Sequence, residues 1–174
     1  MTKAWLEQLE GWHDFYVIVG SAAAGLTGLM FVVVSLGPKV ISGRGSSGVR
    51  GFVTPTVVFF TTVLVMSTVM AIPALSLKML RVILCIGGLG ALIYLVWIRS
   101  HKQWRESQLD RLDWCWYIGL PFLSYLSIVA NAIVMGLNAT VGLAMLGGTV
   151  ILLLVIGIRN AWDLVLWMAQ QTKD

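Results

Sequence analysis

Charged residues are scarce in this chain of 174 residues. They make up 11% of it, against about a quarter of an average soluble domain. Twelve basic and eight acidic side chains are too few to cover a soluble globule of this size, and 58% hydrophobic residues are too many for a disordered chain. The mean hydropathy of +0.87 agrees. The composition therefore excludes both classes and indicates an integral membrane protein of one domain.

Histidine and cysteine are also scarce, with two of each. Cys85 and Cys115 are too few for a disulfide framework and are expected to be packing residues. His13 and His101 are expected on opposite sides of the membrane, where one subunit cannot place both on one metal ion. Neither an H-E-x-x-H nor a C-x-x-C motif occurs. We therefore expect no catalytic residue, no metal site and no cofactor; the alternative is an enzyme that acts on a lipid through His101 or Asp113.

Long uncharged runs are what the sequence has in abundance. A transmembrane helix needs about 20 apolar residues. Residues 114–158 form 45 residues without a charge, which fits two spans separated by the turn-forming residues 136–140. The sequence predicts an all-α polytopic membrane helical bundle in a single domain, 1–174. About five transmembrane helices are expected, at approximately 15–37, 52–76, 80–98, 115–136 and 140–159.

Short interfacial helices are expected at both ends of the chain. Trp5, Leu9 and Trp12 share one helical face, so residues 2–13 are predicted to lie on the bilayer. The alternative, equally weighted, is that they extend the first span. At the second span, Thr54 is a good N-cap and Pro55 suits the first helical position, which predicts a helix start there.

The distribution of lysine and arginine predicts the orientation of the spans. Basic residues concentrate in loops on the cytoplasmic side of a membrane. With the N-terminus outside and the C-terminus in the cytoplasm, nine of the twelve basic residues lie inside: Lys39, Arg44, Arg50, Arg99, Lys102, Arg105, Arg111, Arg159 and Lys173. The net charge of +4 then reflects orientation in the lipid bilayer, and no nucleic-acid partner is expected.

No ionisable residue falls in the middle of a predicted span, which disfavours proton-coupled transport. Milder polar residues recur at seven-residue spacing, on one helical face each. The second span carries Thr54, Thr61 and Thr68, and the fourth carries Ser124 and Asn131. These stripes predict either a polar path between helices or, as the stronger alternative, packing in which hydroxyls bond their own helix.

Small residues give the clearest packing signal. Gly20, Ala24 and Gly28 recur every four residues in the first span, and Gly25 lies beside them. Such a ridge allows another helix to approach closely. The approaching helix is expected to come from the same subunit or from another copy.

The C-terminal segment holds a second group of polar residues. Arg159 and Asp163 are four residues apart and can pair on a helix. Together with Asn160 they are candidates for a polar contact with a partner on the inner side. The alternative, which we favour, is the end of an interfacial helix with one ion pair.

Four stretches of the sequence carry a resemblance. They are residues 14–24 with Gly28 and Leu29, residues 52–56, residues 113–116 with Leu120 and Pro121, and residues 156–163. In these segments the chain resembles small bacterial inner-membrane proteins that have no assigned activity. The resemblance implies a helical protein of the bacterial inner (cytoplasmic) membrane and brings no cofactor or catalytic residue.

Two functions compete at this point. The first is a non-catalytic membrane protein that acts through helix packing, as a homo-oligomer or as an accessory subunit of a membrane complex. Its partner is then itself or another membrane protein. The alternative is a small channel or carrier for an ion or solute, lined by the threonine and asparagine stripes.

Overall fold

The computed structural model describes residues 3–36, 46–100 and 115–171 of the chain. Every long element in these ranges is a helix, and the described residues contain no strand. The elements are α1 (Lys3–Leu36), α3 (Ser46–Met70), α4 (Leu77–Ser100), the π-helical turn η2 (Cys115–Gly119), α6 (Leu120–Leu137) and α7 (Ala139–Gln171). The predicted all-α helical bundle is confirmed.

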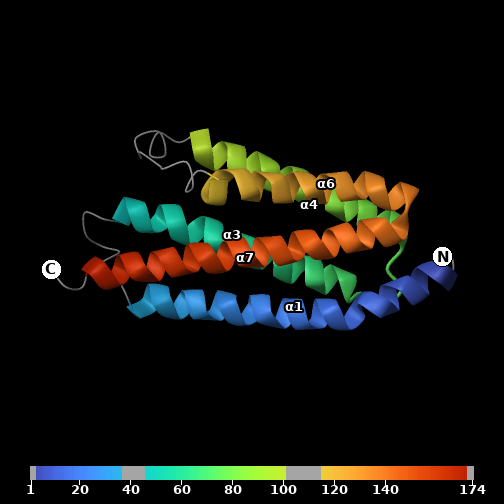
Figure 1. Cartoon of the computed structure of the whole chain (residues 1–174), viewed down its shortest axis with the longest axis horizontal. Coiled ribbons are helices and arrows are strands. Elements are labelled where there is room, and N and C mark those ends of the chain that lie inside the picture. The colour runs from blue at the N-terminus through green and yellow to red at the C-terminus, as the bar shows by residue number, and fades with distance from the viewer. Residues whose placement is uncertain (1–2, 37–45, 101–114, 172–174) are drawn as a thin grey trace.

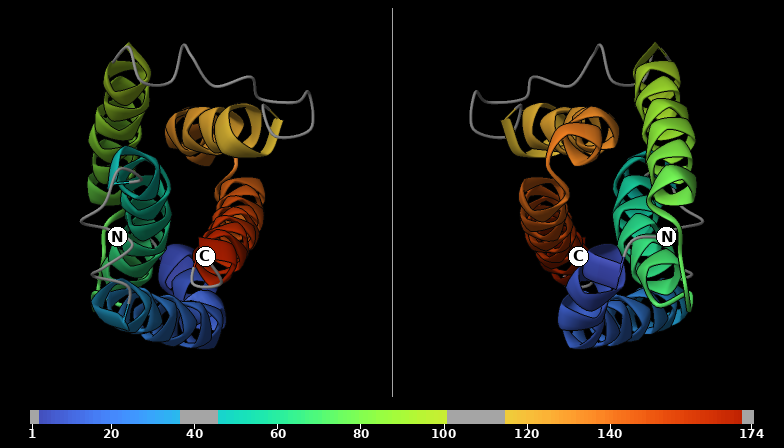
Figure 2. Two further views of the ribbon diagram at one scale, coloured as in Figure 1. Left: turned by 90° about the vertical axis from the view of Figure 1, so that its left-hand side faces the viewer. Right: turned by 90° about the vertical axis from the view of Figure 1, so that its right-hand side faces the viewer.

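The five long helices run side by side and alternate in direction along the long axis of the molecule (Figure 1). The beginning of α1 and the end of α7 therefore lie at opposite ends. Contacts connect α1 with α3, α3 with α7, α7 with α6 and α6 with α4, and α1 also touches α7. The end-on views in Figure 2 show α4 at the edge of the bundle. It packs mainly on α6 rather than on α3, its predecessor in the chain.

Within the described ranges, four helices are long and apolar enough to cross a membrane by length and composition. The qualifying stretches are Lys3–Ser35, Leu77–Trp97, Cys115–Leu137 and Ala139–Leu166. In α3 the described apolar stretch, Pro55–Met70, is shorter. The coarse expectation of a polytopic membrane protein is confirmed, while a fifth crossing stays a prediction.

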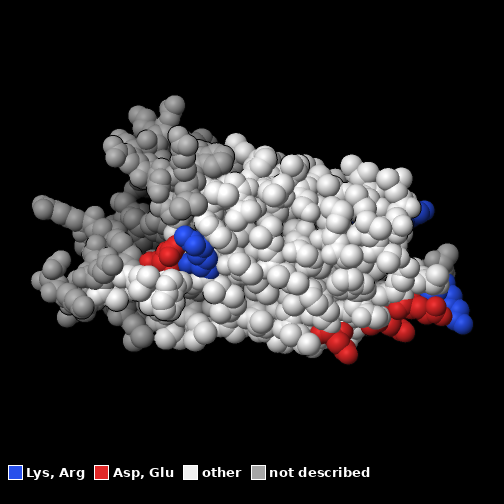
Figure 3. Space-filling view, in the orientation of Figure 1, with Lys and Arg blue, Asp and Glu red and all other residues white. Residues whose placement is uncertain are grey.

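A broad uncharged band crosses the middle of the molecule on the face shown in Figure 3. On the face shown in Figure 3, described Lys, Arg, Asp and Glu side chains lie toward the two ends, and the surface between them carries none. Many large apolar side chains on this bundle are exposed, including Ile18, Ile86 and Ile133 at 64–68%. Exposure of so large an apolar surface to water is unfavourable, whereas its exposure to the hydrocarbon of a bilayer is not.

All five long helices of the described ranges contribute buried side chains to the main core. Phe59 and Val63 of α3, Ile128 of α6 and Leu146 and Leu153 of α7 are fully buried. Because these helices are apolar on all sides, packing and not hydrophobicity distinguishes their inward faces.

The break between the fourth and fifth predicted spans lies where the sequence placed it. Asn138 alone separates α6 from α7, in an extended conformation with φ −148° and ψ 107°. Its Oδ1 accepts a hydrogen bond from the Val141 N–H at 3.2 Å, which caps the start of α7. Ser76 does the same for α4, accepting from the Met79 N–H at 3.2 Å.

Pro121 does not interrupt the helical run at the start of α6. It lies in the first turn of that helix, directly after the π-helical turn η2. Proline has no N–H for the carbonyl four residues earlier, that of Tyr117. The chain is wound more loosely there, with the i→i+5 pattern, and continues as an α-helix.

The predicted interfacial helix at the N-terminus is wrong in its placement. Residues 3–36 form one continuous helix, the alternative that the sequence left open. Trp5 and Leu9 are 5% and 7% exposed and belong to the core, so this face packs on the bundle instead of on lipid. The Trp5 Nε1–H donates to the Leu75 carbonyl at 2.7 Å, in the connection between α3 and α4.

Two further helix ends differ from expectation. The helix α3 begins at Ser46, so Pro55 lies inside it instead of opening it. At the C-terminal end, α7 continues without a break to Gln171, and no separate interfacial helix follows it within the described residues. Both helices are therefore longer than the local sequence signals predict.

Candidate functional site

The small residues of α1 divide between two faces of the helix. Gly20 is buried against α3, where a Cβ atom on it would lie 2.8 Å from Ser67 Cβ. At Gly25 and Gly28 a Cβ atom would meet nothing within 4 Å, and Ala24 is exposed. Only the first member of the predicted ridge is therefore used for packing inside the subunit.

The small residues of α1 that do not pack inside the subunit form a continuous exposed surface. Every exposed residue between Gly20 and Gly28 is serine, alanine or glycine. We call Ser21, Ala22, Ala24, Gly25 and Gly28 the small-residue face. Larger exposed side chains border it on both sides along the helix, namely Val17, Ile18, Leu29, Phe31 and Val32. Small residues between larger ones on an exposed helix side are a pattern that lets the backbone of another helix approach closely.

The polar stripes bond mostly to their own helices. Thr68 Oγ1 donates to the Leu64 carbonyl and Ser124 Oγ to the Leu120 carbonyl, each at 2.8 Å. Asn131 is fully buried, and its Nδ2 donates to the Ser127 carbonyl at 3.0 Å. These contacts are those of the packing alternative. The side chain of Thr54 lies outside the described residues.

One stripe residue, Thr61, does reach a cavity. It lines a groove of about 250 Å³ between α3, α4 and α6, whose other polar members are Thr62 and Tyr125. Thr62 Oγ1 donates to the Val58 carbonyl, so the Tyr125 hydroxyl, 3.0 Å away, donates to Thr62. Ser124 and Asn131 do not line this groove. The two predicted stripes therefore do not converge on a common path in the described part of the chain.

Of the predicted inner-side contact residues near the end of α7, Arg159 and Asp163 lie together and Asn160 does not. Arg159 Nε lies 3.9 Å from Asp163 Oδ2, and the Tyr117 hydroxyl donates to that same oxygen at 2.6 Å. The guanidinium carbon of Arg159 lies 4.6 Å from the centre of the Trp116 ring. Asn160 is only 2% exposed and turns into the bundle, where its Oδ1 has no partner. Arg159 and Asp163 thus share a surface from which Asn160 is separated.

Sequence reasoning missed three interaction partners: Trp116 for Arg159, Tyr117 for Asp163, and Arg81 for the backbone of α6. Arg81 Nε donates to the Ala132 carbonyl at 2.6 Å, near the end of α6. From the sequence alone, an arginine at the start of a membrane helix is expected to contact lipid or solvent. The sequence does not show that the end of α6 lies beside it. The neighbouring aromatic residues Trp116 and Tyr117 were a signal visible in the sequence, because arginine stacks readily on tryptophan.

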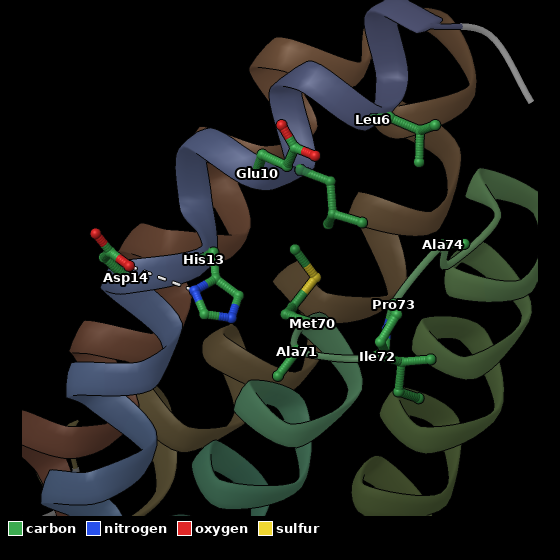
Figure 4. A pocket seen from close by; sticks show the side chains of 10 residues that line it. Leu6, Glu10, His13, Asp14, Met70, Ala71, Ile72, Pro73 and Ala74 are labelled. Atoms are coloured by element: carbon green, nitrogen blue, oxygen red, sulfur yellow. Dashed lines mark hydrogen bonds and ion pairs between the residues drawn. The ribbon is translucent and has the colours of Figure 1, made fainter.

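A cavity of about 460 Å³ opens at the other end of the bundle, between the first turns of α1 and the connection after α3 (Figure 4). Glu10, His13 and Asp14 line it from α1, and Pro73 and Ala74 face them. His13 Nδ1 lies 3.3 Å from Asp14 Oδ1. Both of these side chains are largely exposed. Across the described ranges, no three His, Cys, Asp or Glu residues are grouped so that they could hold a metal ion.

The candidate residues for the lipid-acting enzyme, His101 and Asp113, lie outside the described residues. No protein family, curated protein or solved structure matches this chain.

Proposed function

We propose that the protein is a non-catalytic membrane protein that acts by helix packing, and that two copies associate through the small-residue face of α1. The supporting observation is the exposure of this face. A Cβ atom at Gly25 or Gly28 would have no neighbour within 4 Å, although the same helix packs tightly at Gly20. Small residues at four-residue spacing let two helix backbones approach, and the van der Waals contact so gained drives association in lipid.

A second copy is the occupant that fits the face best. In a two-fold dimer the same surface meets itself, so it has to be complementary to its own shape. Ser21, Gly25 and Gly28 follow one another at spacings of four and three along the centre of the face. Two such seams can cross closely, while the larger side chains on either side, such as Ile18 and Val32, pack around the partner helix.

The test is native mass spectrometry of the protein extracted gently from its own membrane. We expect a dimer for the wild type, and Gly25→Leu and Gly28→Leu should each raise the dimer dissociation constant by about tenfold, which corresponds to about 1.4 kcal/mol. Gly90→Leu in α4 and Gly148→Leu in α7 are matched controls. Both replace an exposed helical glycine with open space around it, and both should leave the dimer intact.

Three outcomes are informative. A dimer that survives both Gly25→Leu and Gly28→Leu contradicts the proposal. A monomeric wild type that retains a different membrane protein, lost on the same substitutions, makes the chain an accessory subunit and overturns the homodimer. Loss of the dimer in the Gly90→Leu control as well would place the interface elsewhere.

We also propose that the protein resides in the cytoplasmic membrane of a bacterium, with the N-terminus outside and the C-terminus in the cytoplasm. The excess of lysine and arginine on one side supports this orientation. The opposite placement of the beginning of α1 and the end of α7 agrees with an odd number of crossings (Figure 1).

The channel or carrier is the weaker proposal. Its candidate lining residues Thr68, Ser124 and Asn131 already bond to their own helices. Flux through liposomes that changes with Asn131→Leu and Thr61→Val would favour it over the packing function.

A further inference from the structure

The guanidinium of Arg159 is unusual because it forms no hydrogen bond with the described residues. Its nearest polar neighbour is Asp163, and the distance of 3.9 Å from Nε to Oδ2 is too long for a hydrogen bond. Nε itself is buried, and none of the residues that the structure describes accepts a hydrogen bond from it. Asp163 is in turn occupied by the short hydrogen bond from Tyr117. An arginine with unpaired donors is costly beside hydrocarbon, so it requires an acceptor.

The surroundings of Arg159 are apolar and open outward. A cavity of about 400 Å³ is lined by Trp116, Val155, Ile158, Arg159 and Trp162. Val155, Ile158 and Trp162 are each at least 45% exposed, and the Arg159 side chain is 41% exposed. Their spacing of three and four residues places them on one face of α7.

We place this cavity at the edge of the bilayer, because the charged residues of α7 border the uncharged band. In Figure 3 a pair of opposite charges lies over α7, at the border of the uncharged band, and Arg159 and Asp163 are the charged residues of that helix. Val155 lies one turn of helix, about 6 Å, toward the middle of the molecule from Arg159. The apolar wall is thus on the hydrocarbon side of the cation, and Trp162 is on the other side, where indoles prefer the interface.

We propose that this cavity binds one anionic phospholipid. Its phosphate accepts two hydrogen bonds from the Arg159 guanidinium, a geometry for which the planar fork of arginine is suited. One acyl chain lies along Val155 and Ile158. Trp116 holds the guanidinium by stacking, and the Tyr117 hydroxyl holds Asp163 Oδ2 by a hydrogen bond. The phosphate accepts from the terminal nitrogens of the guanidinium, which form no hydrogen bond with the described residues.

The experiment is native mass spectrometry of the full chain in mixed micelles with equal amounts of phosphatidylglycerol and phosphatidylcholine. The lipid is counted on the monomer, so the result does not depend on dimer formation. We expect the first bound lipid to be phosphatidylglycerol, and Arg159→Gln should reduce that preference about tenfold, as expected for a lost charge-assisted hydrogen bond. Arg159→Lys, which keeps the charge but not the fork, should retain part of it.

Lys78→Gln is the matched control, because it removes one positive charge from an exposed position at the other end of the bundle. It should leave the preference unchanged. An undiminished preference in Arg159→Gln overturns the proposal, and so does displacement of the lipid by millimolar glycerol 3-phosphate, which would make the site one for a free phosphate.

Trp162→Ala serves as a second variant if Arg159→Gln does not fold. This indole is 62% exposed, so its removal opens the cavity without disturbing the core. A preference for phosphatidylglycerol that is unaffected by Trp162→Ala would also contradict the site.

Discussion

Trp5 illustrates how much one side chain contributes when it connects segments far apart in the chain. Its ring is buried in the core and its N–H reaches the Leu75 carbonyl, 70 residues away. Three residues later, Gln8 Nε2 donates to Thr140 Oγ1 at 2.9 Å. The first turns of α1 are therefore attached both to the connection after α3 and to the start of α7.

Replacing Trp5 by phenylalanine removes the donor and keeps an aromatic ring. The free energy of unfolding should fall by about 1 kcal/mol, the usual cost of one neutral hydrogen bond. The measurement is reversible denaturation in detergent micelles, followed by circular dichroism. Trp162→Phe, at an exposed indole, is the control and should change stability by less than about 0.5 kcal/mol. Equal effects of the two substitutions would mean that the bond to Leu75 contributes nothing.

The elements show why glycine alone does not indicate where helices touch. In α7, Gly157 packs against Phe60 of α3, and a Cβ atom there would lie 2.5 Å from the ring. Gly148, nine residues earlier in the same helix, would have nothing within 4 Å. The two positions look alike in the sequence, because both lie in an uninterrupted apolar stretch.

This pair yields a prediction for the contact between α3 and α7. Gly157→Ala should destabilise the protein by about 1–3 kcal/mol through overpacking, since the fully buried Phe60 ring has little room to move. Gly148→Ala should stay within about 0.5 kcal/mol of the wild type. Thermal unfolding of the two variants in the same detergent measures the difference. A Gly157→Ala protein as stable as Gly148→Ala would show that the helices separate easily at Phe60.

The sequence predicted the elements far better than their faces. Long apolar runs reveal membrane helices, and Asn138 marked a true helix break because its side chain caps the next helix. The inward faces could not be predicted, since lipid and protein interior are both apolar and impose no polar side on a helix. That is why Gly20 and Gly25, five residues apart, looked like one ridge. The same reason hid the burial of Trp5, which is as suited to a membrane interface as to a core.

At the scale of the whole molecule, the alternating helices define two ends. The beginning of α1, the connection after α3 and the connection between α6 and α7 share one end, as the contacts of Trp5 and Gln8 require. The end of α7 lies at the other (Figure 1). The segments at one end of the bundle are therefore expected to lie together on one side of the membrane, and those at the other end on the opposite side.

Reporter fusions test the proposed orientation. Alkaline phosphatase, which is active only outside the cytoplasm, should be active when inserted after Ser76 and inactive at the C-terminus. A fluorescent protein that folds only in the cytoplasm should give the opposite pattern. The physical reason is the excess of basic residues on the C-terminal side, which are retained in the cytoplasm. Activity of the phosphatase at the C-terminus would reverse the orientation, and activity at both sites would mean an even number of crossings between them.

The attachment of α1 to the start of α7 has a consequence for biosynthesis. Gln8 and Thr140 are separated by 132 residues, so their hydrogen bond cannot form until translation has proceeded that far beyond Gln8. At roughly 5–20 residues per second that interval is on the order of 10 s. Throughout that interval the Gln8 amide lacks Thr140 as its partner, although Leu75, the partner of the Trp5 indole, has already been synthesised. Formation of the Gln8–Thr140 hydrogen bond is therefore a late step of assembly. A translation arrest before α7 would prevent it.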